Sequence, residues 1–181
     1  MKDIVKPIAV LASICLAVTA LLAFVNSVTS PIIQKAAEEK AAAARNEVLG
    51  EANGEFDTLS DEDMEKLGLP AEITEVSKAK NGSGAVISVT VKGYGGDIKL
   101  MLGIKSDGSI EKIYTLEHSE TSGIGSRVVD NKSGYSDKYI GKTEDSYSEV
   151  DAISGATISS KAYKKAISIA YEGFDIVKEA A

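Results

Sequence analysis

The chain has 181 residues, a net charge of −7 at pH 7, one cysteine, one histidine and no tryptophan. Its length suits one domain of ordinary size plus an additional segment. A single cysteine excludes an internal disulfide framework, a CxxC redox pair and an iron–sulfur site made by this chain alone, and one histidine argues against a metal site. Residues 1–25 carry a net charge of +1, which leaves −8 for the rest. An acidic domain repels phosphate backbones, which argues against nucleic acid as a partner.

Residues 8–25 form an uninterrupted run of 18 uncharged and mostly apolar residues, long enough for a transmembrane helix. Lys2 and Lys6 precede this run, so the positive-inside tendency predicts a cytoplasmic N-terminus and a domain on the extracytoplasmic side. The competing interpretation is a cleaved signal peptide, which the long run and the weak cleavage pattern at residues 28–30 disfavour. We therefore expect a single-pass anchor in the cell membrane over residues 1–29.

A helical stalk is expected after the anchor, over residues 30–50. Pro31 should begin or kink this second helical stretch, because proline lacks the amide that a helix interior needs. Residues 36–44 are rich in Ala, Glu and Lys, which are strong helix formers, and Gly50 is a plausible stop.

The main domain is expected over residues 51–181, beginning with a polar stretch in which Ser60 opens a short helix at residues 61–67. Asn81-Gly82 and Asp107-Gly108 are hairpin signals. They join two pairs of predicted strands, at residues 73–79 and 85–92 and at residues 98–104 and 110–116. A long polar loop at 126–148, a short strand at 150–153 and a final helix at 159–180 are expected to follow. Hairpins with segregated helices define an α+β fold with antiparallel strands and a C-terminal helix.

The most informative segment is Asp151-Ala152-Ile153-Ser154-Gly155-Ala156-Thr157. Its Ser-Gly pair is typical of a turn, since Gly155 can adopt a positive φ. Ser159 or Ser160 is a plausible N-cap for the helix that follows. Thr157 would then lie just before a helix N-terminus, where free N–H groups and the helix dipole favour an anion. On the helix signals alone, the segment is equally typical of a capping sequence without a ligand.

This segment resembles the flavinylation motif of the FMN-binding domain family, and Ile158-Ser159-Ser160 continues the match. The resemblance implies that FMN is joined covalently, through its phosphate, to the hydroxyl of Thr157. It also implies a cofactor-binding role for the residues around that point, Ser154, Gly155, Ala156, Ile158 and Ser159. A separate FMN transferase is expected to attach the cofactor, because nothing in the chain resembles a self-flavinylating enzyme.

A second segment, Gly93-Tyr94-Gly95-Gly96, resembles the G-Y-G-G segment of the same family. It lies between two predicted strands. Glycine backbone beside an aromatic side chain would line a flavin ring, so all four residues are candidates for cofactor binding. Taken alone, the pattern is equally typical of a plain strand connection.

A third segment, residues 118–125, resembles the H-x-E-T-P-G-L-G loop of the family. Ser122 replaces the usual proline, which removes a fixed φ and should loosen the loop, and isoleucine replaces the usual leucine. Glu120 and Thr121 are expected to hydrogen-bond the polar edge of the flavin or its ribityl chain. His118 is a further candidate for flavin contact.

Together, the three motifs, the anchor and the stalk resemble the G subunits of the Rnf ion-translocating electron-transport complex. The resemblance implies a membrane-anchored flavoprotein that passes electrons between other membrane and redox subunits, rather than an enzyme on its own. The whole complex would move electrons between ferredoxin and NAD⁺ and pump Na⁺ or H⁺. The alternatives are a free-standing exported FMN electron shuttle and the similar C subunit of the Na⁺-translocating NADH:quinone reductase.

Hypotheses without a flavin stay open on the sequence. One is an anchored binding domain in which Thr157 only caps a helix. Another is a serine-nucleophile enzyme, since residues 77–80 fit the S-x-x-K pattern, but they end a predicted strand and the companion motifs are missing. No G-x-G-x-x-G opens a helix after a strand, so the chain is not expected to bind NAD itself.

Overall fold

The computed structural model describes residues 2–180, and it divides the chain into two compact units, Met1–Lys40 and Ala41–Ala181. Helix α1, Lys2–Val48, supplies the described part of the first unit and continues into the second. It runs through both Pro7 and Pro31, so no second helix begins at Pro31. Among the described residues this is the one helix long and apolar enough to cross a membrane. The predicted boundaries after residues 29 and 50 stay a prediction.

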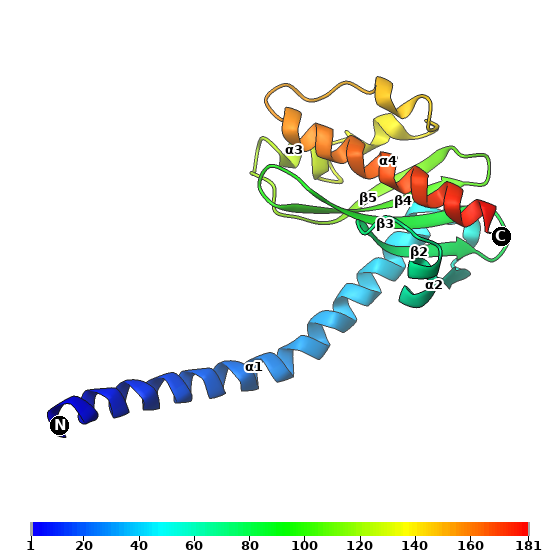
Figure 1. The fold of residues 1–181 in the computed structure, drawn as a ribbon. Coiled ribbons are helices and arrows are strands. Elements are labelled where there is room, and N and C mark those ends of the chain that lie inside the picture. Colours follow the sequence, from blue (N-terminus) through cyan, green and yellow to red (C-terminus); the bar gives the residue numbers. More distant parts are fainter. Residues whose placement is uncertain (1, 181) are drawn as a thin grey trace. The chain divides into compact units, whose positions relative to one another are not determined.

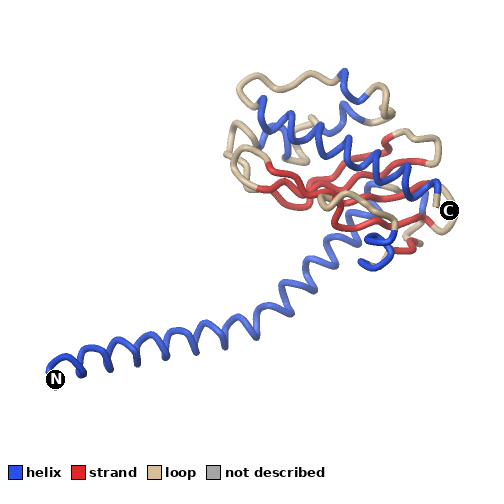
Figure 2. The backbone as a smooth tube through the Cα atoms, viewed as in Figure 1, coloured by secondary structure: helices blue, strands red, loops and turns tan. Residues whose placement is uncertain are grey.

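The second unit is built on a five-stranded sheet in the order β1-β2-β3-β4-β5, in which every neighbouring pair is antiparallel (Figures 1 and 2). The strands are β1 Phe56–Thr58, β2 Ile73–Ala79, β3 Gly84–Lys92, β4 Asp97–Lys105 and β5 Ile110–His118. The last four lie within two residues of their predicted bounds. Gly82 and Gly108 have φ of 72° and 83° in the two predicted hairpin turns, as those tight turns require.

Helix α4, Thr157–Glu179, lies across one face of the sheet (Figure 1). The sequence has six apolar residues at helical spacing along this helix, and all six are buried, namely Tyr163, Ala166, Ile167, Ala170, Phe174 and Val177. They pack against alternate residues of the sheet, such as Ile87, Leu100 and Leu102, in one continuous core. Burial on this scale is the main stabilising contribution to the domain. The predicted α+β fold with a C-terminal helix is therefore confirmed.

A second, smaller core lies on the opposite face of the sheet, where the last turns of α1 pack. Ala44, Val48 and Leu49 are at most 2% exposed there, against Val86 and Met101. Gly103 allows this close approach, because a Cβ at that position would lie 1.9 Å from the Val48 carbonyl oxygen. Residues 41–48 thus belong to the compact domain.

The remaining segments are short helices and irregular chain. The helix η1 Gly50–Ala52 precedes the sheet, and α2 Asp61–Lys66 lies between β1 and β2. Between β5 and α4 lie α3 Ser126–Val129, η2 Ser136–Tyr139 and η3 Tyr147–Glu149. Ser60 caps α2 as predicted, since its hydroxyl accepts a hydrogen bond from the Asp63 amide. Beside β5, the Asn131 side-chain amide bonds to both the N–H and the C=O of Thr115, at 2.7 and 3.0 Å.

Three local expectations were wrong. Strand β1 was not predicted, and residues 150–153 are not a strand: Val150 is buried in the core, but the segment pairs with no other strand. Neither Ser159 nor Ser160 is the N-cap of α4, which begins at Thr157 with Ala156 at the N-cap position. Ser160 instead lies inside the helix and uses its hydroxyl to accept a hydrogen bond from the Ile153 amide at 3.1 Å.

Candidate flavin site

Thr157 is the first residue of α4, and its side chain is exposed. The turn before it is held by its backbone conformation and by hydrogen bonds. Gly155 has φ of 81°, which glycine adopts without strain, and the Ala156 amide bonds to the Ile153 carbonyl at 2.9 Å. The bond from the Ile153 amide to Ser160 ties the turn to the first turn of the helix. The Thr157 hydroxyl is therefore held in an accessible position at the end of a rigid helix.

The N-terminus of α4 has no side-chain cap. Ala156 has no hydroxyl or carboxylate to offer, and its φ of −120° and ψ of 33° differ from the extended backbone of an ordinary N-cap. The first N–H groups of an α-helix have no partner within the helix, and they carry the positive end of the helix dipole. An anion attached to Thr157 would be adjacent to these groups.

The Gly93–Gly96 segment is the tight turn between β3 and β4, closed by a hydrogen bond from the Gly93 amide to the Gly96 carbonyl at 2.8 Å. Its glycines face the following loop. A Cβ on Gly95 would lie 2.5 Å from the Ser119 carbonyl oxygen, and one on Gly96 would lie 2.7 Å from the Ser119 Cβ. These glycines are thus required by contact between two loops.

The loop after β5 places Ile124 at an exposed tip. Within it, the amides of Ile124 and Ser126 bond to the Thr121 carbonyl, at 3.3 and 3.1 Å, and Gly123 has φ of 77°. The Gly123 amide bonds to the Ser126 hydroxyl at 2.8 Å. Although Ser122 replaces the proline of the family pattern, these hydrogen bonds give the loop a compact turn.

All three motif segments meet at one hollow of about 380 Å³. Its walls are formed by Tyr94, Ile124, Gly125, Gly155, Ala156, Thr157, Ile158 and Ser159. Large apolar side chains line its mouth, since Tyr94, Ile124 and Ile158 are 69%, 51% and 56% exposed. Outside α1, the only other described large apolar side chain so exposed is Ile140. An open hollow with apolar walls and a hydroxyl at a helix N-terminus fits a flat aromatic ring joined to a phosphate.

The structure separates the predicted site residues into two groups. Tyr94, Gly155, Ala156, Thr157, Ile158 and Ser159 line the hollow, whereas Gly93, Gly95, Gly96, His118, Glu120, Thr121 and Ser154 do not. Ile124 and Gly125 line it without having been named as candidates. The signal for them was present, because they end the matched loop motif.

Three tyrosine rings pack together next to the segment that leads to Thr157. Tyr135, Tyr139 and Tyr163 contact one another with centroids 5.6–5.7 Å apart, and the Tyr135 hydroxyl bonds to the carbonyl of Asp151, the first motif residue, at 3.2 Å. Burial, and for Tyr139 also its hydrogen bond to Tyr135, raises the pKa of the Tyr139 and Tyr163 hydroxyls well above the ordinary value. Tyr139 and Tyr163 therefore stay neutral, and their rings act as packing.

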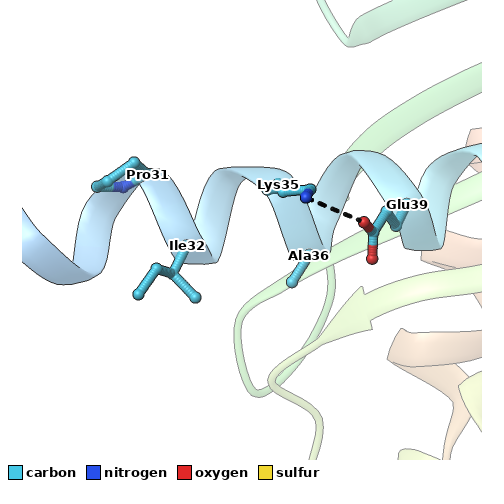
Figure 3. A pocket seen from close by; sticks show the side chains of 5 residues that line it. All are labelled: Pro31, Ile32, Lys35, Ala36 and Glu39. Carbon is cyan, nitrogen blue, oxygen red and sulfur yellow. Dashed lines mark ion pairs between the residues drawn. The ribbon is translucent and has the colours of Figure 1, made fainter.

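A larger hollow, of about 460 Å³, lies on α1 in the first unit and is bordered by Pro31, Ile32, Lys35, Ala36 and Glu39 (Figure 3). It contains a Lys35–Glu39 ion pair of 4.0 Å whose side chains are 78% and 72% exposed. A single helix supplies all five residues, so the hollow is a surface groove with one wall. It has none of the convergent groups of a binding site.

Comparisons with known proteins match two regions of the chain to protein families. Residues 93–172 match the FMN-binding domain family, and residues 1–48 match the RnfG N-terminal region. The G subunit of the Na⁺-translocating ferredoxin:NAD⁺ oxidoreductase complex of Acetobacterium woodii is 31% identical, covering 83% of this chain and 82% of the relative. The G subunit of the ion-translocating oxidoreductase complex of Methanosarcina acetivorans is also 31% identical, covering 92% of both chains. Among solved structures, the crystal structure of Shewanella oneidensis NqrC is 24% identical, with a TM-score of 0.45 over 54% of each chain.

The family match over residues 93–172 takes in every segment that meets at the hollow, so the second unit contains an FMN-binding domain. With identity sustained over most of the chain and a matching N-terminal helix, the chain belongs to the family of G subunits of ion-translocating oxidoreductase complexes, the Rnf family.

Proposed function

We propose that this chain carries FMN on the Thr157 hydroxyl through a phosphoester and transfers electrons as the G subunit of an Rnf-type complex. The main support for this attachment is the position of Thr157. It is an exposed hydroxyl in the hollow where the three motif segments meet, at the start of a 23-residue helix without a side-chain cap. When bound, FMN supplies one- and two-electron redox chemistry that no side chain of this protein provides.

The attachment forms one bond and breaks one. Attachment would join the Thr157 Oγ1 atom to the FMN phosphorus; the hydroxyl proton would pass to a base, and the bond from the phosphorus to the leaving group of the flavin donor would break. A threonine hydroxyl is a weak nucleophile without an adjacent base. The described residues that line the hollow include no His, Lys, Asp or Glu, which supports a separate FMN transferase as the source of the base. The exposure of Thr157 allows such an enzyme to reach it.

The chain's own groups would hold the two ends of FMN differently. At the phosphate end, the free N–H groups at the start of α4 would face the two non-bridging oxygens of the phosphodiester, which share one negative charge. At the ring end, Tyr94, Ile124 and Ile158 offer apolar surface that is now exposed to water. Burying these side chains against an isoalloxazine ring is favourable, at about 25 cal/mol per Å² of apolar surface.

Electron transfer in a complex is supported by the family. The relatives are named as subunits of ion-translocating oxidoreductases, and the Acetobacterium woodii relative as one acting between ferredoxin and NAD⁺. For this chain we propose the other membrane and redox subunits of such a complex as partners. The flavin domain would lie on the extracytoplasmic side, because Lys2 and Lys6 precede the apolar stretch of α1.

The attachment is tested in full-length protein expressed in a host that contains the transferase. Thr157→Ala should abolish the flavin fluorescence that stays with the protein on a denaturing gel, and the intact mass should fall to that of the bare chain. Ser154→Ala is the matched control, since it removes a neighbouring exposed hydroxyl and should leave the fluorescence unchanged. Fluorescence retained by Thr157→Ala would place the flavin on another residue.

Two further measurements address assembly and topology. An affinity tag on this chain should copurify membrane subunits from native membranes, whereas a free-standing shuttle would purify alone.

A reporter fused after Ala181 should behave as exported, and cytoplasmic reporter activity would reverse the proposed orientation.

A further inference from the structure

We propose that Glu120 is a positioning residue, whose carboxylate joins the Gly93–Gly96 turn to the loop at residues 118–125 and so fixes one wall of the flavin site. This proposal rests on the proposed function only for its consequence on the flavin. The joining of the two loops is a property of the protein alone. Glu120 does not line the hollow, and its carboxylate is fully engaged elsewhere.

Both carboxylate oxygens of Glu120 accept hydrogen bonds from successive amides of the turn. Oε1 accepts from Tyr94 N at 2.7 Å, and Oε2 accepts from Gly95 N at 3.3 Å. Glu120 is 8% exposed and forms no ion pair with a described residue, so backbone N–H groups are what stabilise its charge. Hydrogen bonds to a charged acceptor are stronger than neutral ones, and an unsatisfied buried charge is costly.

The glycines around Glu120 are explained by its side chain. A Cβ on Gly93 would lie 2.0 Å from Oε1, and a Cβ on Gly125 would lie 2.2 Å from Oε2. The three atoms nearest to that position on Gly125 all belong to Glu120. Gly93, which the motif suggested as a flavin contact, and Gly125 are thus both needed to admit a carboxylate between the loops.

This arrangement links two of the three large apolar side chains at the mouth of the hollow, Tyr94 and Ile124. Tyr94 is held through its own amide, and Ile124 belongs to the loop that carries Glu120. The Glu120 amide in turn bonds to His118 Nδ1 at 3.3 Å, so the sole histidine orients the start of this loop. Without the carboxylate, Tyr94 and Ile124 would lose their fixed separation, and a flavin ring between them would be held less uniformly.

The first experiment measures amide hydrogen exchange in detergent-solubilised full-length protein without flavin. In Glu120→Ala, the amides of Tyr94 and Gly95 should exchange at least about tenfold faster, as expected when charge-assisted hydrogen bonds are lost. Glu120→Gln keeps one carbonyl oxygen, so it should retain protection at Tyr94 and lose it at Gly95. Glu117→Ala is the control, because Glu117 lies at the same end of β5 with an exposed side chain. Wild-type exchange at both amides in Glu120→Ala would overturn the proposal.

The second experiment uses flavinylated protein and a double-mutant cycle. Glu120→Ala should leave the amount of covalent flavin within about twofold of wild type, while the visible circular dichroism of the flavin falls and its midpoint potential shifts. Gly125→Ala should produce a similar loss, since its methyl group collides with the carboxylate. The double variant should be no worse than either single one. Additive losses would show that the two residues act separately and would overturn the proposal.

The outcomes separate this proposal from the proposed function. If wild-type protein carries no covalent flavin, the attachment at Thr157 fails, and the amide-exchange test still decides the role of Glu120. If Glu120→Ala changes the flavin spectrum without changing exchange at Tyr94 and Gly95, Glu120 touches the flavin directly, and the positioning role is wrong.

Discussion

The two ends of the flavin site use glycine for opposite reasons. In the turn before Thr157, Gly155 has φ of 81° and nothing within 4 Å of where a Cβ would be. In the facing loops, Gly93, Gly95 and Gly125 lack such a positive φ, but a Cβ would come within 2.5 Å of a neighbouring atom. The attachment end therefore depends on backbone conformation, and the ring end depends on close contact between segments. Replacing a glycine by a larger residue should therefore strain the backbone at the attachment end and cause steric overlap at the ring end.

The largest effect is expected from Gly95→Ala. Its methyl group would meet backbone atoms of Ser119 and Glu120, at 2.5 and 3.0 Å, and backbone cannot move aside as a flexible side chain can. Overpacking of this kind costs about 1–3 kcal/mol. Thermal unfolding of full-length protein should show a midpoint lowered by several degrees, together with a weaker flavin dichroism signal. An unchanged midpoint would mean that the two loops are not packed as described.

Gly155→Ala should cost less, about 1 kcal/mol, because it strains only the backbone. Gly155→Asn should recover part of this loss, since asparagine tolerates a positive φ better than alanine does. Gly82→Ala is the control, with φ of 72° and no neighbour within 4 Å, in a hairpin away from the site. Both alanine variants should lower the unfolding midpoint similarly, but Gly155→Ala alone should reduce the yield of covalent flavin.

Ala156→Ser tests whether the start of α4 is open to an anion. In protein without flavin, the new hydroxyl can cap a free N–H and stabilise the fold by up to about 1 kcal/mol. If flavin is attached at Thr157 as proposed, its phosphate would already face these groups, so the gain should disappear in flavinylated protein. Ala152→Ser, at an exposed position of the preceding loop, should change neither form. An equal gain in both forms would place the phosphate away from the helix end.

The smallest effect is expected at α2. The Ser60 side chain caps the start of this helix, so α2 is the capped reference for the uncapped start of α4. The hydrogen bond from the Ser60 hydroxyl at 2.7 Å holds the pKa of Asp63 below its ordinary value near 3.8. A carboxyl whose pKa is lowered on folding stabilises the fold above its unfolded pKa, and that contribution is lost as pH falls through the folded value.

Ser60→Ala should therefore raise the Asp63 pKa toward 3.8 in an NMR titration and reduce the drop in stability between about pH 4 and pH 2. Asp107 is the control, because its pKa is lowered by a separate hydrogen bond from Ser109. The Asp107 titration should not change in the Ser60→Ala variant.

Much of the fold could be predicted because its signals are local. The Asn-Gly and Asp-Gly turn signals located four strands, and helical spacing located the buried face of α4. Strand β1 was missed because three residues carry no periodic signal, and its pairing with β2 is what makes it a strand. Residues 150–153 have suitable residues for a strand but no partner strand, which a single sequence does not reveal.

The candidate site was predictable in its location but not in the role of each residue. The motifs identified three segments, and all three meet at one hollow. The role of Glu120 depends on amides 25 and 26 residues away, and that of Ser160 on an amide seven residues before it. Tertiary contacts like these override local preference, which is why Ser160 was mistaken for a cap.

The Asn131 side chain has a consequence for how this domain meets other proteins. The Asn131 side chain bonds to both the N–H and the C=O of Thr115. It therefore satisfies backbone groups at the edge of the sheet with which a sixth strand would otherwise pair. At the next stretch of β5, the Ile110 amide bonds to the Lys142 carbonyl, and the Gly141 amide bonds to the Ile110 carbonyl. At Thr115 and Ile110, the N–H and C=O groups are therefore not free to pair with another chain, which guards against edge-to-edge aggregation at these points. A partner that approaches this edge at Thr115 or Ile110 would therefore meet side chains rather than free backbone groups.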